Sequence, residues 1–254
     1  MSETDTVTEE EGEYADGDVV LEAKDVSHSY GDLNVLDGVS MSLRAGEVTA
    51  LLGANGSGKT TLLRILAGLL TPDDGDIVVG AGKAARTVGY LPQTPSFRNG
   101  FTVAETLRFY ASLLDADVSD DYIDGALETV GLLDARERRV SGLSGGMTRL
   151  LGIAQASVGE PPIMMLDEPT SGLDPEMTGR IFEVLDGLAD DGAAVLLTTH
   201  DLEKVGRNAD KVVLIHNRTV AESGTPQEVV ERRGAEELSE VFDAVVRDGE
   251  GGRG

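Results

Sequence analysis

The chain of 254 residues contains no cysteine, no tryptophan and only five lysines. Without cysteine it has no disulfide framework, no thiolate zinc site and no thiol nucleophile. No apolar run approaches the roughly 18 residues that a membrane-spanning helix needs. Residues 1–17 are acidic and polar, unlike a signal peptide or an amphipathic presequence. We therefore expect a cytoplasmic chain that reaches a membrane only through a partner.

Basic residues are also scarce: 21 Lys and Arg stand against 46 Asp and Glu, which gives a net charge of −25. Such a surface repels nucleic acid and anionic lipid, so nucleic acid is not an expected partner. It also repels itself at low ionic strength, where screening is weak. The composition resembles that of proteins from a salt-in, halophilic cytoplasm such as a haloarchaeal one. An acidic mesophilic protein is the alternative.

The segment Gly53–Thr61 is the most informative pattern that is present, because it fits G-x-x-x-x-G-K-[ST]. The apolar run Val48–Leu52 predicts a buried strand before it, and apolar spacing predicts a helix over Lys59–Leu70 after it. Backbone N–H groups of such a loop bind phosphate oxygens, and the helix N-terminus adds partial positive charge. The lysine is expected to reach the β- and γ-phosphates, and Thr60 to ligate Mg²⁺. The expected phosphate contacts are Gly53, Ala54, Asn55, Gly56, Ser57, Gly58, Lys59, Thr60 and Thr61.

A second apolar run, Ile163–Leu166, predicts a buried strand that ends in two carboxylates. We expect Asp167 to hold Mg²⁺ beside Thr60, and Glu168 to polarise the attacking water as a general base. Upstream, Ser144–Gly146 begins a predicted helix, which makes a second N-terminus able to bind an anion. Because the chain already has a phosphate-binding loop (P-loop) at Gly53–Thr61, this second helix is expected to serve the γ-phosphate of a nucleotide held by another subunit.

The order of the predicted elements indicates an α/β protein built on a mostly parallel sheet. Together with the Gly53–Thr61 motif, this resembles a P-loop NTPase core of the RecA-like type. Alternating apolar runs over residues 19–43 predict an antiparallel β subdomain, broken by a turn at Tyr30–Asp32. Thr102 and Glu105 form a capping box in a helical region that contains the Ser144 helix. The expected divisions are an acidic disordered tail over 1–17, a nucleotide-binding domain over 18–233 with its helical subdomain at about 95–160, and a C-terminal helix with a mobile tail over 234–254.

Six motifs in a fixed order make the chain resemble the nucleotide-binding subunit of an ABC transporter, over roughly Val19–Arg233. Two residues depart from the family pattern: Met147 replaces a common Gln, and Leu150 a frequent Arg. Neither of these two residues supplies the serine hydroxyl or the glycine amides that face the phosphate. The matches are the Walker A loop Gly53–Thr61, the Q-loop residue Gln93, the signature Leu143–Met147, the Walker B end Asp167–Pro169, the D-loop Ser171–Asp174 and the switch histidine His200.

The resemblance implies roles for residues outside the loop. It implies that Gln93 senses Mg²⁺ and contacts the membrane partner, that His200 contacts the γ-phosphate, and that Tyr30 stacks on adenine. It also implies that Asp174 lies at the nucleotide site and that ATP lies between the Walker A loop of one subunit and Ser144, Gly145 and Gly146 of another. The other histidines, His28 and His216, receive no role.

The resemblance also implies the partners: a second nucleotide-binding subunit, as a homodimer, and a separate multi-helix permease at the inner face of the cell membrane. Ala154–Ala156 and Leu238–Phe242 look like segments of exporter subunits, although the second also fits a plain amphipathic helix. A soluble ABC ATPase of the iron–sulfur assembly type stays open as the alternative. A regulatory GTPase or P-loop kinase is disfavoured, because the chain has no Asn-Lys-x-Asp base-reading motif.

Overall fold

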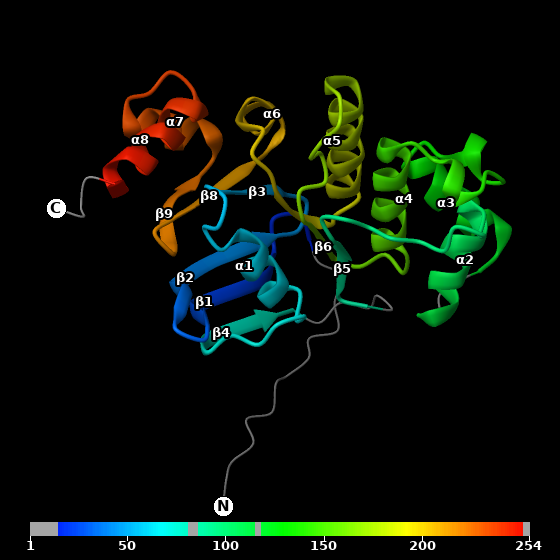
Figure 1. The fold of residues 1–254 in the computed structure, drawn as a ribbon, viewed down its shortest axis with the longest axis horizontal. Helices are drawn as coiled ribbons and strands as arrows, with labels where there is room; N and C mark the ends of the chain where they lie inside the picture. Colours follow the sequence, from blue (N-terminus) through cyan, green and yellow to red (C-terminus); the bar gives the residue numbers. More distant parts are fainter. Residues whose placement is uncertain (1–14, 81–85, 115–117, 251–254) are drawn as a thin grey trace, which may run out of the picture.

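The computed structural model describes residues 15–80, 86–114 and 118–250, and its strands form two sheets (Figure 1). The smaller sheet is antiparallel in the order β2-β1-β4. Its strands are β1 (Val19–Tyr30), β2 (Leu33–Arg44) and β4 (Asp74–Val79). β1 and β2 are separated by the turn at Gly31 and Asp32, so the antiparallel β subdomain predicted from apolar alternation is confirmed.

The larger sheet has the order β5-β6-β7-β3-β8-β9, and each pair in it is parallel except β8 with β9. Carboxyl ends of parallel strands share one edge of a sheet, which is where ligands bind in such folds. The segments that follow β3, β5, β6 and β7 therefore meet at that edge. The strands are β3 (Val48–Leu52), β5 (Val88–Leu91), β6 (Ile163–Leu166), β7 (Ala194–Thr198), β8 (Lys211–His216) and β9 (Thr219–Gly224).

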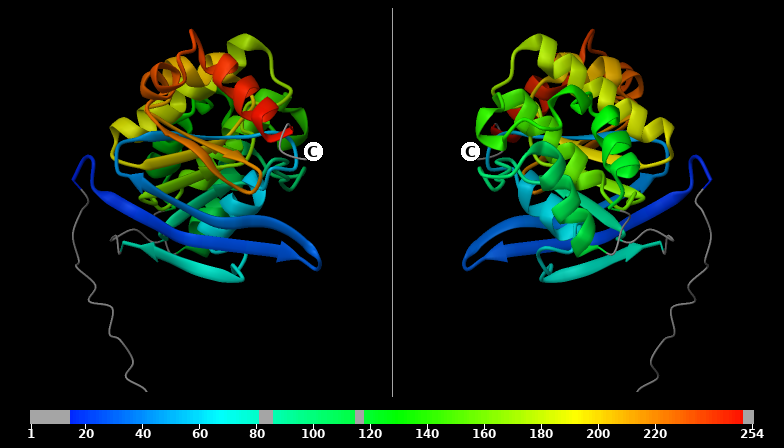
Figure 2. Two further views of the ribbon diagram at one scale, coloured as in Figure 1. Left: turned by 90° about the vertical axis from the view of Figure 1, so that its left-hand side faces the viewer. Right: turned by 90° about the vertical axis from the view of Figure 1, so that its right-hand side faces the viewer.

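Helices cover both faces of the larger sheet. In Figure 1, α2, α3 and α4 gather at one end of the molecule, while α7 and α8 lie at the other. Figure 2 shows the antiparallel sheet on the side of the molecule opposite α5 and α6. The helices are α1 (Lys59–Leu66), α2 (Val103–Leu113), α3 (Asp120–Thr129), α4 (Gly145–Ser157), α5 (Pro175–Asp190), α6 (Leu202–Asn208), α7 (Pro226–Arg233) and α8 (Leu238–Glu250), with 3-10 turns η1 (Leu133–Ala135) and η2 (Val140–Gly142).

Two apolar clusters hold these layers together, one on each face of the parallel sheet. Ala50 and Leu52 of β3 enter the cluster shared with the α2–α5 helices, while Leu51 between them enters the cluster shared with α1, β1 and β2. Successive side chains of a strand point to opposite faces, so a strand covered on both faces is apolar at most positions. This explains why β3 is apolar except at Thr49, which is buried with the rest.

The first helix is shorter than the sequence predicts. Apolar spacing extended it to Leu70, but α1 ends at Leu66, and Leu69 is 60% exposed instead of packed. Gly68 has φ +69, a left-handed conformation that ends helices and directs the chain away from the helical path. The expected bounds Lys59–Leu70 are therefore wrong at the carboxyl end.

Both ends of the chain bear on the expected divisions. Residues 1–14 and 251–254 lie outside the described part, but 15–17 form a turn on the end of β2, which differs from the tail expected over 1–17. The Gly17 N–H donates to the Ala45 carbonyl at 3.0 Å, and the Gly17 carbonyl accepts from Arg44 at 2.6 Å. α8 adds Leu238 and Val241 to the main core. Within the described ranges, no helix has the length and apolar character that crossing a bilayer requires.

Candidate active site

The P-loop connects β3 to α1 in the order that the sequence predicts. Gly58 is the N-cap of α1 with φ +100, a conformation that favours glycine. A Cβ atom there would lie 2.8 Å from Leu36 Cδ2 and 2.9 Å from the Val35 carbonyl oxygen, so β2 also excludes a side chain. In contrast, Ala54, Asn55 and Gly56 are exposed at the loop crest. The loop is thus anchored at its helical end and open where phosphate would bind.

The ammonium group of Lys59 lies inside this loop. Its Nζ donates to the Gly53 carbonyl at 2.7 Å and to the Ala54 carbonyl at 3.1 Å, and the residue is buried. Burial lowers the pKa of Lys59, while the carboxylates of Glu168 and Asp167 act against that fall. The loop carbonyls therefore fix a cation near the carboxylates of Asp167 and Glu168.

Asp167 is the centre of a hydrogen-bond network that joins three segments. Its Oδ1 accepts from the Thr60 hydroxyl at 3.1 Å and from the Thr198 hydroxyl at 2.8 Å, and only 1% of the residue is exposed. Thr198 also accepts from the Glu168 N–H at 2.8 Å. The structure thus brings Thr60 and Asp167 together as predicted. Thr198 was missed, although it is a polar residue at the carboxyl end of an apolar strand, which is the signal that would have identified it.

Glu168 and His200 also meet. His200 Nδ1 lies 3.0 Å from Glu168 Oε2, where an imidazole N–H donates to the carboxylate. The glutamate side chain is 13% exposed and the histidine side chain is 71% exposed. Glu168 has φ +49, which costs a non-glycine residue about 1–2 kcal/mol. The hydrogen bond from the Glu168 N–H to Thr198 helps to hold this backbone conformation. The conformation directs the carboxylates of Asp167 and Glu168 to different positions.

The signature segment lies at the start of α4, and Ser144 is its N-cap as predicted. The Ser144 Oγ accepts from the Met147 N–H at 3.2 Å. Gly145 is exposed, and a Cβ atom there would meet nothing within 4 Å. Within the described ranges, no hydrogen bond joins this segment to the P-loop. The exposed glycine leaves that side of the helix N-terminus accessible from outside the molecule.

Gly146 faces inwards and meets the segment that carries Asp174. A Cβ atom on Gly146 would lie 2.6 Å from Met177 Cγ, so a side chain at position 146 would force the Met177 side chain on α5 to move. Asp174 is the N-cap of α5, and its Oδ1 accepts from the Met177 N–H at 2.9 Å. Met177 therefore meets the signature with its side chain and Asp174 of the D-loop with its N–H, and Asp174 acts here as a helix cap.

Gln93 follows β5 and is exposed, and its backbone carbonyl accepts from the guanidinium of Arg149 on α4. No hydrogen bond among the described residues uses the Gln93 side chain, so the structure does not join it to Thr60 or Asp167. Burial lowers the pKa of Arg149, and Glu168 and Asp167 counteract that effect. The sequence reasoning did not identify Arg149, because nothing in the local pattern predicts its contact with Gln93.

The remaining predicted residues lie around the loop. Tyr30 is 49% exposed at the end of β1, and Thr61 is half-buried in the first turn of α1. The Ser57 hydroxyl oxygen is buried and has no hydrogen-bond partner. An unpartnered buried hydroxyl usually has a ligand or water to bind. Ser57 is therefore suited to receive a polar group from outside the chain.

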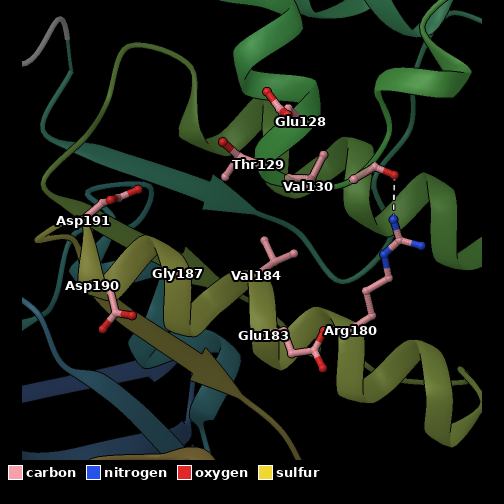
Figure 3. A pocket seen from close by; sticks show the side chains of 10 residues that line it. Glu128, Thr129, Val130, Arg180, Glu183, Val184, Gly187, Asp190 and Asp191 are labelled. Carbon is pink, nitrogen blue, oxygen red and sulfur yellow. Dashed lines mark hydrogen bonds between the residues drawn. The ribbon is translucent and has the colours of Figure 1, made fainter.

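A hollow lies elsewhere, between the end of α3 and α5 (Figure 3). It measures about 490 Å³, and Arg180 donates across it to the Gly131 carbonyl at 2.6 Å. Four acidic residues and one basic residue, Arg180, line it; the acidic ones are Glu128, Glu183, Asp190 and Asp191. Such a lining repels phosphate, so this hollow is not the nucleotide site.

Comparison with known proteins agrees with the geometry at the sheet edge. The family model described as ABC transporter matches residues 36–171, more than half of the chain. The chain belongs to the ABC transporter family. It is an ATP-binding subunit of this family, an ATPase whose hydrolysis of ATP is coupled to transport, on the P-loop NTPase fold.

Two relatives show how far the similarity of this ATP-binding subunit extends. It is 40% identical over 220 residues to an uncharacterized ABC transporter ATP-binding protein, YxlF, of Bacillus subtilis, covering 84% of this chain and 74% of the relative. It is 35% identical over 232 residues to the Nod factor export ATP-binding protein I of Ralstonia nicotianae, covering 88% and 72%.

Solved structures extend the comparison. An ATP-binding subunit of an ABC transporter superimposes with a TM-score of 0.77 at 31% identity, covering 89% of this chain and 99% of the other. The cbiO1 protein of Clostridium perfringens, described as part of the ABC transporter complex cbiONQ, gives 0.75 at 28% identity, covering 89% and 98%.

Proposed function

We propose that this ATPase binds ATP with Mg²⁺ between two copies of the chain and thereby drives export through a separate multi-helix permease. The observation that carries the proposal is the connected network at the sheet edge, in which Thr60, Thr198 and Asp167 share hydrogen bonds and Glu168 meets His200. Positioned hydroxyl, carboxylate and imidazole groups beside a P-loop lysine are what phosphoryl transfer to water requires.

The residues fit both ATP and Mg²⁺. The buried Ser57 hydroxyl without a partner and the open crest of the loop suit phosphate oxygens. Within the described ranges, no group of three or more His, Cys, Asp or Glu side chains is placed to hold a metal. Mg²⁺ does not need one, because it binds through one or two protein oxygens together with water and phosphate. Thr60 and Asp167 would hold it, with Gln93 as the further predicted contact.

The mechanism assigns a step to each polar group. Lys59, held by the loop carbonyls, stabilises charge on the β- and γ-phosphates. Glu168 accepts a proton from the attacking water, and His200 orients that carboxylate and contacts the γ-phosphate. Mg²⁺, when bound, neutralises charge that develops on the phosphates.

The signature completes the site of a second copy. Ser144 and Gly145 lie at an exposed helix N-terminus, which carries partial positive charge suited to a γ-phosphate. Since the described part of the chain gives them no bond to its own P-loop, we infer that a second subunit brings its ATP to them. The γ-phosphate then bridges the two copies, and its removal weakens the bridge. ATP therefore favours the paired state.

A hollow lined in part by the segment that follows Gln93 suits the permease. It measures about 250 Å³ and lies between the loop after β5 and helix α2. The Arg98 guanidinium lies 4.5 Å from the ring centroid of Phe109 and 5.2 Å from that of Phe101. An apolar side chain next to a carboxylate would fit this combination of aromatic rings and a cation. We infer that a cytoplasmic segment of the permease with this chemistry docks here.

Arg98→Glu should reduce recovery of the permease roughly tenfold, because charge reversal places like charges against each other at the contact. Tagged chain is purified from native membranes with MgATP, and the amount of multi-helix membrane protein recovered with it is measured by mass spectrometry. Arg207→Glu is the matched control, since Arg207 lies on α6 and pairs only with Glu203 in the described structure. Equal recovery with Arg98→Glu and wild type would contradict the docking site.

Export is the proposed direction because several relatives are named for it. The Ralstonia nicotianae protein and a Rhizobium meliloti protein, the latter 36% identical over 234 residues, are both named Nod factor export ATP-binding protein I. The alternative of an iron–sulfur assembly ATPase has no support from these names. With a permease as its anchor, the chain would lie at the inner face of the cell membrane.

We infer that the acidic composition adapts this protein to high salt. Burial raises the pKa of Asp186 on α5, and nearby carboxylates raise it further; they are Asp210, Asp190 and Glu183. Such crowding of like charge is repulsive, and dissolved salt screens it. Together with the net charge of −25, this supports a halophilic, haloarchaeal source.

The melting temperature should rise by roughly 10 °C or more between about 0.1 M and about 3 M KCl, since screening relieves repulsion in the folded state. Circular dichroism at a series of KCl concentrations measures this. The variant with Glu183→Gln and Asp190→Asn should show a smaller rise. A melting temperature that does not change with KCl would exclude the adaptation.

A further inference from the structure

His28 is a buried histidine near the predicted adenine contact, and the sequence assigns it no role. Its side chain is only 8% exposed, yet neither ring nitrogen has a hydrogen-bond partner. Buried polar atoms normally have partners, so an imidazole in this state requires an explanation. Its neighbours supply one.

The first neighbour is Tyr30, two residues further along β1. The two ring centroids are 4.9 Å apart and the ring planes meet at 89°, an edge-to-face contact. Tyr30 is 49% exposed at the end of the strand and precedes a two-residue turn. An exposed ring in that position would sample several rotamers, and an edge-to-face contact favours one of them.

The second neighbour is Asp73, from the segment between α1 and β4. Its Oδ2 accepts from the Ser29 N–H at 2.7 Å, and its own N–H donates to the Ser27 carbonyl at 2.9 Å. Its Oδ1 lies 3.6 Å from His28 Nδ1, so a carboxylate faces the imidazole. Asp73 therefore fixes the backbone on both sides of His28 and limits the movement of its ring.

Strand β2 links the group formed by His28, Tyr30 and Asp73 to the P-loop. His28 is opposite Leu36 in the pairing of β1 with β2. The Leu36 side chain is in turn pressed against Gly58, since a Cβ there would lie 2.8 Å from it. A base extending from a phosphate held in the P-loop would thus remain close to the strand end that carries Tyr30.

We propose that His28 and Asp73 are positioning residues that hold the Tyr30 ring in the orientation in which it stacks on adenine. The inference depends on the proposed function, in which Tyr30 makes that contact. A ring fixed in advance loses less conformational freedom when the nucleotide binds, so affinity for the base increases while phosphate chemistry is unchanged. His28 contributes the aromatic contact and Asp73 restricts its movement.

The test separates base binding from phosphate binding. KM and kcat are measured for ATP, and dissociation constants for ATP and for inorganic tripolyphosphate, in wild type, Tyr30→Ala, His28→Leu, His28→Phe and Asp73→Ala. His28→Leu keeps the bulk without the ring and should raise the KM for ATP roughly three- to tenfold. His28→Phe keeps an aromatic ring and should restore the wild-type KM for ATP. Asp73→Ala should act like His28→Leu. For the histidine and aspartate variants, kcat and tripolyphosphate binding should stay at wild-type values.

Each failure has a different meaning. Should Tyr30→Ala leave ATP binding unchanged, the base contact in the proposed function is wrong. If Tyr30→Ala weakens ATP binding and His28→Leu does not, the positioning role is wrong while the base contact stands. A loss of tripolyphosphate binding in His28→Leu equal to the loss of ATP binding, or failure of His28→Phe to restore affinity, shows a structural role only and overturns the inference.

Discussion

Glu168→Gln should bind ATP with nearly wild-type affinity and hydrolyse it about 10²–10⁴-fold more slowly, the typical contribution of a general base. The amide cannot accept the proton of the attacking water, but it keeps the size of the side chain and an oxygen within reach of His200. Because hydrolysis no longer removes the γ-phosphate, paired chains should accumulate. Phosphate release measures the rate, and size exclusion in high-KCl buffer with MgATP measures pairing.

Glu203→Gln is a suitable control, since this exposed residue on α6 forms an ion pair with Arg207 and has no part in the proposed chemistry. It should hydrolyse ATP and elute as wild type does. Wild-type turnover in Glu168→Gln would remove this residue from the role of base. Loss of turnover with single chains only, even with the permease present, would leave the base in place and contradict pairing around ATP.

Mixing Lys59→Ala chains with Ser144→Ala chains should restore hydrolysis that neither variant shows alone. In a two-fold pair, each site combines the P-loop of one copy with the signature of the other. A mixed pair therefore holds one site with both residues changed and one site with neither changed. With random pairing, half of the pairs are mixed, and each mixed pair has one intact site out of two. The mixture should therefore contain up to about a quarter of the intact sites of the wild type.

The control for this experiment is Lys59→Ala mixed with the double variant that carries both changes. No intact site forms in that mixture, so its activity should remain at the level of Lys59→Ala alone. The two mixtures are compared by phosphate release at equal total protein and saturating MgATP. Equal activity in both mixtures would mean that Ser144 does not act on the nucleotide of a second copy.

The local sequence was sufficient to predict the structure where one short segment forms a whole structural unit. The P-loop, the capping box at Thr102 and the strand before Asp167 each depend on a few consecutive residues, and the structure has all three. The meeting of Thr60 with Asp167 was also predictable, because strand–helix alternation implies a parallel sheet whose strand ends share an edge.

Contacts between distant segments were not predictable in the same way. Arg149 reaches the Gln93 carbonyl, and Thr198 bridges Asp167 and Glu168, across separations of 30 residues or more. Such pairs depend on how α4 and β7 are placed in three dimensions. The early end of α1 had a local cause, since Gly68 adopts a left-handed conformation, but glycine is also tolerated inside helices.

The contact between Gly146 and Met177 limits how the sequences of such subunits diverge. A methyl group at position 146 would overlap the Met177 side chain, so alanine at 146 requires the Met177 side chain to move or residue 177 to become smaller. A smaller residue at 177 by itself leaves a gap between two helices, which is a loss of packing. Homologous sequences should therefore vary together at these positions, and a chimera that exchanges only one of the two segments between homologues would inherit a mismatch.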